Sequence, residues 1–155
     1  MTKTTLFLLV ATIGSAAVLL GAYGFQHIGG LAPCKMCLWQ RWPHGAAILI
    51  GILTLASGKR VLAWAGALAA AITGGIGVYH AGVEWGWWPG PTSCTGNGVG
   101  LGNMDGADLL STEGPNTLIM CDEIVWQLLG LSMAGWNAVL SFGLAALWIM
   151  AARRT

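Results

Sequence analysis

Apolar residues run in long blocks along this chain, and charged residues lie between the blocks or at their ends. The stretches 4–34, 61–83 and 124–152 contain no Asp, Glu, Lys or Arg. Each stretch can hold the roughly 20 residues that a helix needs to cross the hydrocarbon of a bilayer. A fourth apolar run follows residue 37 and is interrupted only by Arg41 near its start. The pattern predicts an all-α integral membrane protein, a bundle of four transmembrane helices.

We expect one membrane domain over residues 1–155, with two outward-facing loops. The second loop, residues 83–131, is long. Its part at 95–106 is rich in glycine and is expected to be mobile. The expected helices span about 5–25, 38–56, 61–82 and 132–151, and a short surface helix is possible at 105–120.

Charges set the expected orientation. Five of the seven Lys and Arg residues share one side of this layout, which the positive-inside rule makes cytoplasmic. All six acidic residues fall in the long loop on the other side. Both termini are therefore expected in the cytoplasm. The first apolar run exceeds the roughly 7–15 residues of a signal-peptide core, so we expect an uncleaved helix. The positive residues in question are Lys3, Lys59, Arg60, Arg153 and Arg154.

Composition excludes the soluble classes. Only 8% of the 155 residues are charged, whereas an ordinary globular domain has about 25%. The net charge of +1 gives no electrostatic footprint for nucleic acid. The 24 glycines show no collagen-like period and lie largely in apolar runs, where small residues let membrane helices approach closely.

Four cysteines carry the candidate chemistry, and all four are expected on the outer side or at its interface. Cys34 and Cys37 form a Cys-x-x-Cys pair directly before the expected start of the second helix. A disulfide between them would close a very small ring and would stabilise the fold little, so the pair indicates an exchangeable redox couple. Cys94 and Cys121 lie in the long loop, where a structural disulfide is the ordinary alternative. Zinc is the other alternative, but the loop cysteines do not form a second Cys-x-x-Cys, and we expect no metal.

Three further polar residues are candidates. Arg41 follows Cys37 by four residues and shares its helix face, where a guanidinium can stabilise a thiolate or bind a carbonyl oxygen. Snorkelling to headgroups is the alternative for Arg41. His80, at the outer end of the third helix, is a candidate cofactor contact or an interfacial polar tip. His44 has no assigned role.

Four segments of the chain match a known family: 33–43 (PCKMCLWQRWP), 79–84 (YHAGVE), 90–94 and 121–133. They resemble the bacterial family of disulfide-bond formation protein B (DsbB). The segment 33–43, together with the four-helix layout and the second cysteine pair, is specific to that family. One departure is Ala134-Gly135, where the family often has proline.

The resemblance implies a quinone-dependent, disulfide-generating oxidoreductase of the bacterial inner membrane. Its partner would be a periplasmic thioredoxin-fold dithiol oxidase of the DsbA type. Electrons would pass from Cys94/Cys121 to Cys34/Cys37, through an interloop Cys34–Cys121 bridge, to ubiquinone or menaquinone. Cys37, Arg41 and His80 would be the residues beside the quinone. A membrane transporter, or an assembly protein whose cysteines are only staples, is the alternative function.

Overall fold

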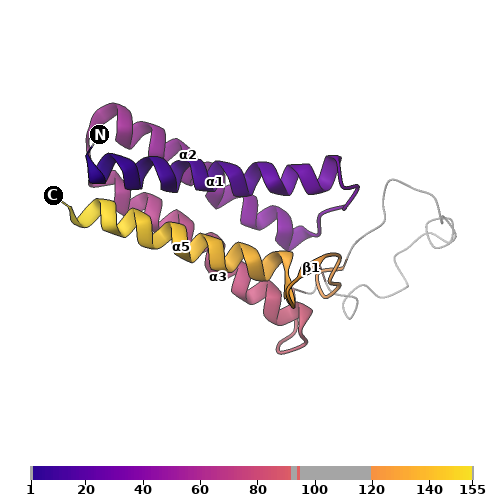
Figure 1. Ribbon diagram of the computed structural model, residues 1–155. Helices are drawn as coiled ribbons and strands as arrows, with labels where there is room; N and C mark the ends of the chain where they lie inside the picture. The colour runs from indigo at the N-terminus through magenta and orange to yellow at the C-terminus, as the bar shows by residue number, and fades with distance from the viewer. Residues whose placement is uncertain (1, 92–93, 95–119, 155) are drawn as a thin grey trace, which may run out of the picture.

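The part of the chain that the structure describes forms four long helices, which pack as an antiparallel bundle (Figure 1). The computed structural model describes residues 2–91, 94 and 120–154. Both termini lie at one end of the bundle, and the connection from the first helix to the second lies at the other end. Two short strands follow the long loop and precede the last helix. The elements are α1 (Lys3–His27), α2 (Lys35–Ser57), α3 (Leu62–Glu84), β1 (Gln127–Leu128), β2 (Leu131–Ser132) and α5 (Met133–Arg153).

Each helix lies on one of the predicted apolar runs, with bounds that differ by a few residues. The largest difference is at α2, which begins three residues earlier than the predicted 38. Its N-cap is Cys34, whose sulfur accepts a hydrogen bond from the backbone N–H of Cys37 at 3.2 Å. A side chain that satisfies one of the orphan N–H groups of a first turn stabilises the helix start. Cys37 is therefore a helical residue, while Cys34 lies just outside the helix.

Among the described residues, three helices are long and apolar enough to cross a membrane: α1, α3 and α5. The fourth, α2, is of similar length but has polar side chains in its first three turns, including Gln40, Arg41 and His44. Its remaining half is apolar. The polar side chains Gln40, Arg41 and His44 line an internal cavity. This explains why the sequence of α2 differs from that of the other three helices.

Small residues bring α3 and α5 together, as the glycine content predicts. Gly66 lies against the ring of Trp148, which is fully buried. A Cβ added to Gly77 would lie 2.9 Å from the carbonyl oxygen of Ala134 and 3.0 Å from the amide nitrogen of Ala138. Neither backbone atom can move aside alone. Close backbone contact of this kind is how membrane helices associate without a hydrophobic driving force.

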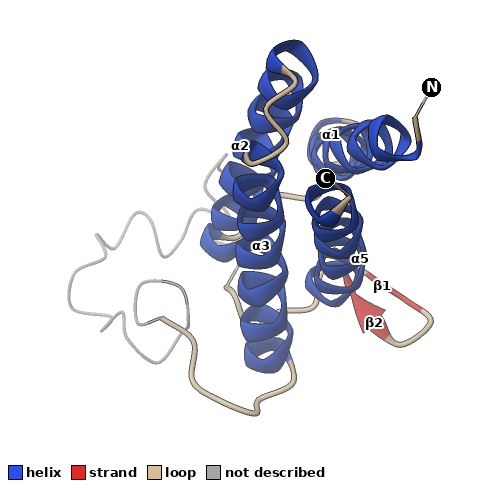
Figure 2. Cartoon of the chain, turned by 90° about the vertical axis from the view of Figure 1, so that its left-hand side faces the viewer, coloured by secondary structure: helices blue, strands red, loops and turns tan. Residues whose placement is uncertain are grey.

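Figure 2 looks onto the bundle end that holds both termini. The positive residues at the helix ends there are Lys3 at the start of α1, Lys59 and Arg60 between α2 and α3, and Arg153 at the end of α5. Arg60, just before α3, donates a hydrogen bond from Nη1 to the carbonyl oxygen of Arg154 at 2.9 Å. The guanidinium of Arg154 lies over the ring of Phe7 at 5.0 Å. The predicted grouping of these charges at one end of the fold is therefore present in the structure.

The β1–β2 hairpin was not predicted. Leu129 and Gly130 form its two-residue turn with φ of 53° and 79°, the left-handed values of a type I′ turn. Trp136 of α5 donates its indole N–H to the carbonyl oxygen of Leu128 at 3.0 Å, which fixes the hairpin on the helix. The predicted loop 83–131 is thus ordered at its end. The predicted mobile stretch at 95–106 and surface helix at 105–120 lie outside the described residues, except for Met120.

Candidate redox site

The four cysteines meet at the bundle end remote from the termini. Cys94 and Cys121 form a disulfide with their Cα atoms 5.3 Å apart, and both are buried. The backbone N–H of Cys121 donates to the carbonyl oxygen of Cys94 at 2.7 Å. The bridge joins the segment after α3 to the segment before the hairpin. The two loop cysteines therefore sit on the bundle and not away from it.

Cys34 lies between this disulfide and Cys37. Its Sγ is 3.0 Å from Sγ of Cys37, and both are thiols in the structure. The same Sγ lies within 4.8 Å of the sulfur atoms of both Cys94 and Cys121. Thiol–disulfide exchange needs one sulfur to approach another directly. The order disulfide, Cys34, Cys37 therefore places each sulfur beside its nearest exchange partner.

Cys34 is buried, with 4% of its surface exposed. The hydrogen bond that its thiol donates to Cys37 and its removal from water both raise the pKa of Cys34 above the ordinary cysteine value. The backbone N–H groups at the start of α2 act in the opposite direction and lower it. The raising effects are larger, so Cys34 holds its proton in this reduced state.

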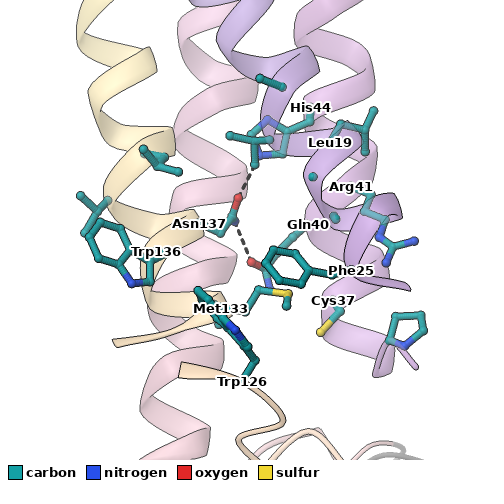
Figure 3. A pocket seen from close by; sticks show the side chains of 18 of the residues that line it. Leu19, Phe25, Cys37, Gln40, Arg41, His44, Trp126, Met133, Trp136 and Asn137 are labelled. Atoms are coloured by element: carbon teal, nitrogen blue, oxygen red, sulfur yellow. Dashed lines mark hydrogen bonds between the residues drawn. The ribbon is translucent and has the colours of Figure 1, made fainter. Parts of the chain in front are cut away.

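A cavity of about 880 Å³ lies between α1, α2 and α5 (Figure 3). Its walls are mostly aliphatic and aromatic. Cys37 lines it, whereas Cys34 does not. The two members of the Cys-x-x-Cys pair thus face different neighbours: Cys34 faces the disulfide and Cys37 faces the cavity. The polar or sulfur-bearing residues of its wall besides Cys37 include Gln40, Arg41, His44 and Asn137.

Arg41 lies in the cavity wall one turn beyond Cys37, as the four-residue spacing predicts. Its Nη1 donates to Oε1 of Gln26 at 2.6 Å, and its guanidinium lies over the ring of Tyr23 at 4.7 Å. Both contacts come from α1. The Nε of Arg41 is buried and has no hydrogen-bond partner among the described residues. The Nε–H of Arg41, a residue of the cavity wall, is therefore a donor that the described residues leave unpaired.

His80 lies on the thiol side of the site and is absent from the wall of the large cavity. Its Nε2 is 3.5 Å from Sγ of Cys34 and 3.8 Å from Oε1 of Glu84. These residues, with Cys37, line a separate cavity of about 20 Å³. His80 therefore contacts Cys34 and does not line the large cavity, and its role beside a cofactor stays a prediction.

Two side-chain amides that were not predicted as site residues connect the cysteine cluster with the wall of the large cavity. Gln40 Nε2 lies 3.3 Å from the carbonyl oxygen of Met36 and 2.9 Å from Nδ1 of His80. Asn137 Nδ2 donates to Oε1 of Gln40 at 2.6 Å and to the carbonyl oxygen of Thr73 at 3.3 Å. Because backbone carbonyls only accept, they fix which end of each amide is the donor. The hydrogen bonds therefore run in one direction along α2, α3 and α5.

This arrangement bears on metal binding. Cys34, Cys37 and His80 have ligand atoms within 4.8 Å of one another, as do Cys34, Cys94 and Cys121. However, Gln40 donates to Nδ1 of His80, which leaves the proton of the neutral ring on Nε2 and no lone pair facing the thiols. In the second set the sulfur atoms of Cys94 and Cys121 are bonded to each other in a disulfide and are not thiolate ligands. Neither set supplies three available ligand atoms in this state.

The chain is similar to known disulfide bond formation proteins along almost its whole length. The sequence model of the family "Disulfide bond formation protein DsbB" matches residues 3–151. A disulfide bond formation protein B from Albidiferax ferrireducens is 34% identical over 94% of this chain and 83% of the relative. One from Verminephrobacter eiseniae is 36% identical over 92% and 82%, and one from Azoarcus sp. is 33% identical over 98% and 95%. No solved structure matches the chain.

Proposed function

Because the chain belongs to the DsbB family of disulfide bond formation proteins, which implies a disulfide-forming oxidoreductase of the membrane, we propose a specific reaction for it. It reoxidises a soluble thioredoxin-fold dithiol oxidase of the DsbA type and passes the electrons to a membrane quinone, ubiquinone or menaquinone. The observation that carries the proposal is the order of the sulfurs. Cys34 lies within 4.8 Å of both loop sulfurs and 3.0 Å from Cys37, which alone of this pair lines the apolar cavity.

The exchange steps follow from that order. A thiolate of the reduced partner attacks the Cys94–Cys121 disulfide, and a mixed disulfide forms. The partner's second thiolate breaks it, so the partner leaves oxidised and the loop pair is left as two thiols. A loop thiolate then attacks an oxidised Cys34–Cys37 pair at Cys34, which releases Cys37. The second loop thiolate closes the loop disulfide again. Two electrons and two protons have then moved to Cys34 and Cys37, the state that the structure shows.

The final acceptor must be a strong oxidant. A DsbA-type couple lies near about −120 mV, and each 30 mV uphill costs about 1.4 kcal/mol for two electrons. An ordinary dithiol could not oxidise such a partner. A bound quinone would supply the two-electron, two-proton oxidation of the Cys34 and Cys37 thiols that the side chains cannot, and would itself be reduced to the hydroquinone.

The cavity fits such a molecule. Its volume of about 880 Å³ is within the range of small-molecule sites. The wall is apolar, as a hydrophobic ring and tail require, and Cys37 and Arg41 lie on one face of α2. The unused Nε–H of Arg41 is a donor for a carbonyl oxygen. Cys37 and Arg41 would hold the ring. His80 would act on the thiol side as a hydrogen-bond donor to Cys34 rather than as a contact of the ring.

We further propose that α2 is a fourth membrane span and that the protein lies in the bacterial inner membrane. Both termini would then be cytoplasmic and all four cysteines periplasmic, since the positive residues gather at the terminal end of the bundle. A membrane-impermeant thiol reagent applied to intact, reduced cells should label Cys94 and Cys121. Labelling of these two only after lysis would contradict this orientation.

The reaction is tested with purified protein, a reduced DsbA-type oxidase and a soluble quinone. We expect quinone reduction that is stoichiometric with partner oxidation. The Cys37→Ser variant is the matched control, because it leaves the loop disulfide intact but removes the sulfur that lines the cavity. Partner oxidation without quinone reduction, or equal quinone reduction by Cys37→Ser, would contradict the proposal.

A further inference from the structure

His44 is a buried residue of the cavity wall that the proposed exchange reaction leaves unused. It lies one turn beyond Arg41 on α2, and 2% of its surface is exposed. Its Nε2 is 2.9 Å from Oδ1 of Asn137 (Figure 3) and 3.5 Å from Oγ of Ser141. Its Nδ1 is buried and has no hydrogen-bond partner among the described residues.

The partners of Asn137 determine which nitrogen of His44 carries the proton. Asn137 Nδ2 must donate, because one of its contacts is the backbone carbonyl of Thr73 at 3.3 Å. Asn137 Oδ1 is therefore the acceptor that faces His44. A neutral imidazole has one N–H and one bare nitrogen. His44 accordingly donates from Nε2, and Nδ1 is left as a bare acceptor.

A bare acceptor discriminates between the two forms of a quinone. Both oxygens of an oxidised quinone are carbonyls, which only accept hydrogen bonds. The reduced form has hydroxyl groups, which can donate. An unpaired buried acceptor is costly, and a hydroxyl donor would satisfy it. The Nε–H of Arg41 does not discriminate in this way, since it donates and can pair with an oxygen of either form.

We propose that His44 is a second polar contact of the quinone site and that its Nδ1 accepts a hydrogen bond from the reduced form, with Asn137 as the positioning residue that fixes its tautomer. The proposal rests on the proposed function. Neighbouring side chains cover Nδ1, so the bound molecule must displace one of them to reach it. Tighter binding of the product form favours reduction, because a tenfold preference for it raises the two-electron potential in the site by about 30 mV.

Binding of a short-chain quinone and of its hydroquinone to the purified protein tests the proposal without turnover. We expect His44→Phe to weaken hydroquinone binding about three- to tenfold, the loss of one neutral hydrogen bond. Quinone binding should change by less than about twofold on the same reasoning. The control is His27→Gln, which removes an exposed histidine of α1 outside the cavity wall. Equal weakening of both forms, or no change in either, would overturn the proposal.

A second measurement does not depend on a stable His44→Phe protein. The chain has three histidines, so ¹⁵N spectra of histidine-labelled protein can be assigned with two variants, His27→Gln and His80→Gln, which leave His44 as the remaining signal. We expect His44 as the Nε2–H tautomer and a mixture of tautomers in Asn137→Leu, with a smaller preference for hydroquinone. The Nδ1–H tautomer in the unmodified protein would refute the inference alone. Failure of the unmodified protein to bind either form would overturn the proposed function and this inference with it.

Discussion

Replacement of Arg41 gives the most direct test that electrons leave the protein through a quinone bound in the cavity. Its guanidinium contacts Gln26 at 2.6 Å and Tyr23 at 4.7 Å, and its Nε–H has no partner among the described residues. If that N–H binds a quinone oxygen, Arg41→Ala removes one charge-assisted hydrogen bond. Such a bond contributes about 1.5–3 kcal/mol. At about 1.4 kcal/mol per factor of ten, quinone binding should weaken about 10- to 150-fold.

Two intermediate variants separate the charge from its placement. Arg41→Lys keeps the charge but loses the planar fork that contacts Gln26, so it should restore only part of the loss. Gln26→Leu leaves the guanidinium present but releases it from α1. Loss of that positioning contact should raise the apparent KM about two- to tenfold, with little change in kcat.

Stopped-flow reduction of a soluble quinone by the reduced protein measures these effects. Exchange between the loop disulfide and the partner serves as the folding control, because it should be unchanged in all three variants. Arg60→Ala is the matched arginine control at the opposite end of the bundle. Quinone kinetics in Arg41→Ala within twofold of the unmodified protein would leave the arginine as a headgroup anchor and refute the cofactor assignment.

Three further results are expected. Cys94→Ser should abolish turnover with the protein partner, while a small dithiol should still drive quinone reduction; normal partner oxidation would exclude the relay. Gly77→Ala should destabilise the bundle by about 1–3 kcal/mol in thermal unfolding, because its Cβ meets backbone atoms, and Gly75→Ala, which meets open space, should not. The raised pKa of Cys34 keeps its reactive thiolate scarce at neutral pH, so its alkylation profile should lie to the alkaline side of a free cysteine; coincident profiles would show that burial and the bond to Cys37 have little effect.

The sequence was sufficient for the helices because membrane insertion leaves a strong signal. A charge-free run of more than 20 residues has few alternatives in structure. The spacing of Cys37 and Arg41 also follows directly from helix geometry, since residues four apart share a face. The start of α2 was placed three residues late. The reason is that a cysteine is a rare N-cap, and propensity rules favour Ser, Thr, Asp or Asn there.

The hydrogen bonds that join His80, Gln40 and Asn137 inside the bundle could not be predicted in the same way. Gln40 and Asn137 are 97 residues apart and meet only because α2 and α5 both face the cavity. Nothing local in the sequence pairs them. A general signal was present, because uncharged polar residues inside membrane helices are enriched at helix contacts. Gln40 and Asn137 carry neither a charge nor a thiol or imidazole, so no pattern of candidate chemistry in the sequence singles them out. The contact of His80 with Cys34 could not be predicted either, because position along a helix does not say which neighbour a side chain faces.

The N-cap of α2 links oxidation state to helix stability. The sulfur of Cys34 both undergoes exchange and accepts the N–H of Cys37. Cys34 keeps its proton in the reduced state, so its sulfur is a neutral cap. Ionisation of Cys34 during exchange would strengthen this cap, because a charged acceptor binds an N–H more strongly than a neutral one and a thiolate at a helix N-terminus is stabilised by the helix dipole. Return to the thiol, or entry into a disulfide, would remove that charge. The stability of the turn that presents Cys37 to the cavity therefore follows the chemical state of a single sulfur.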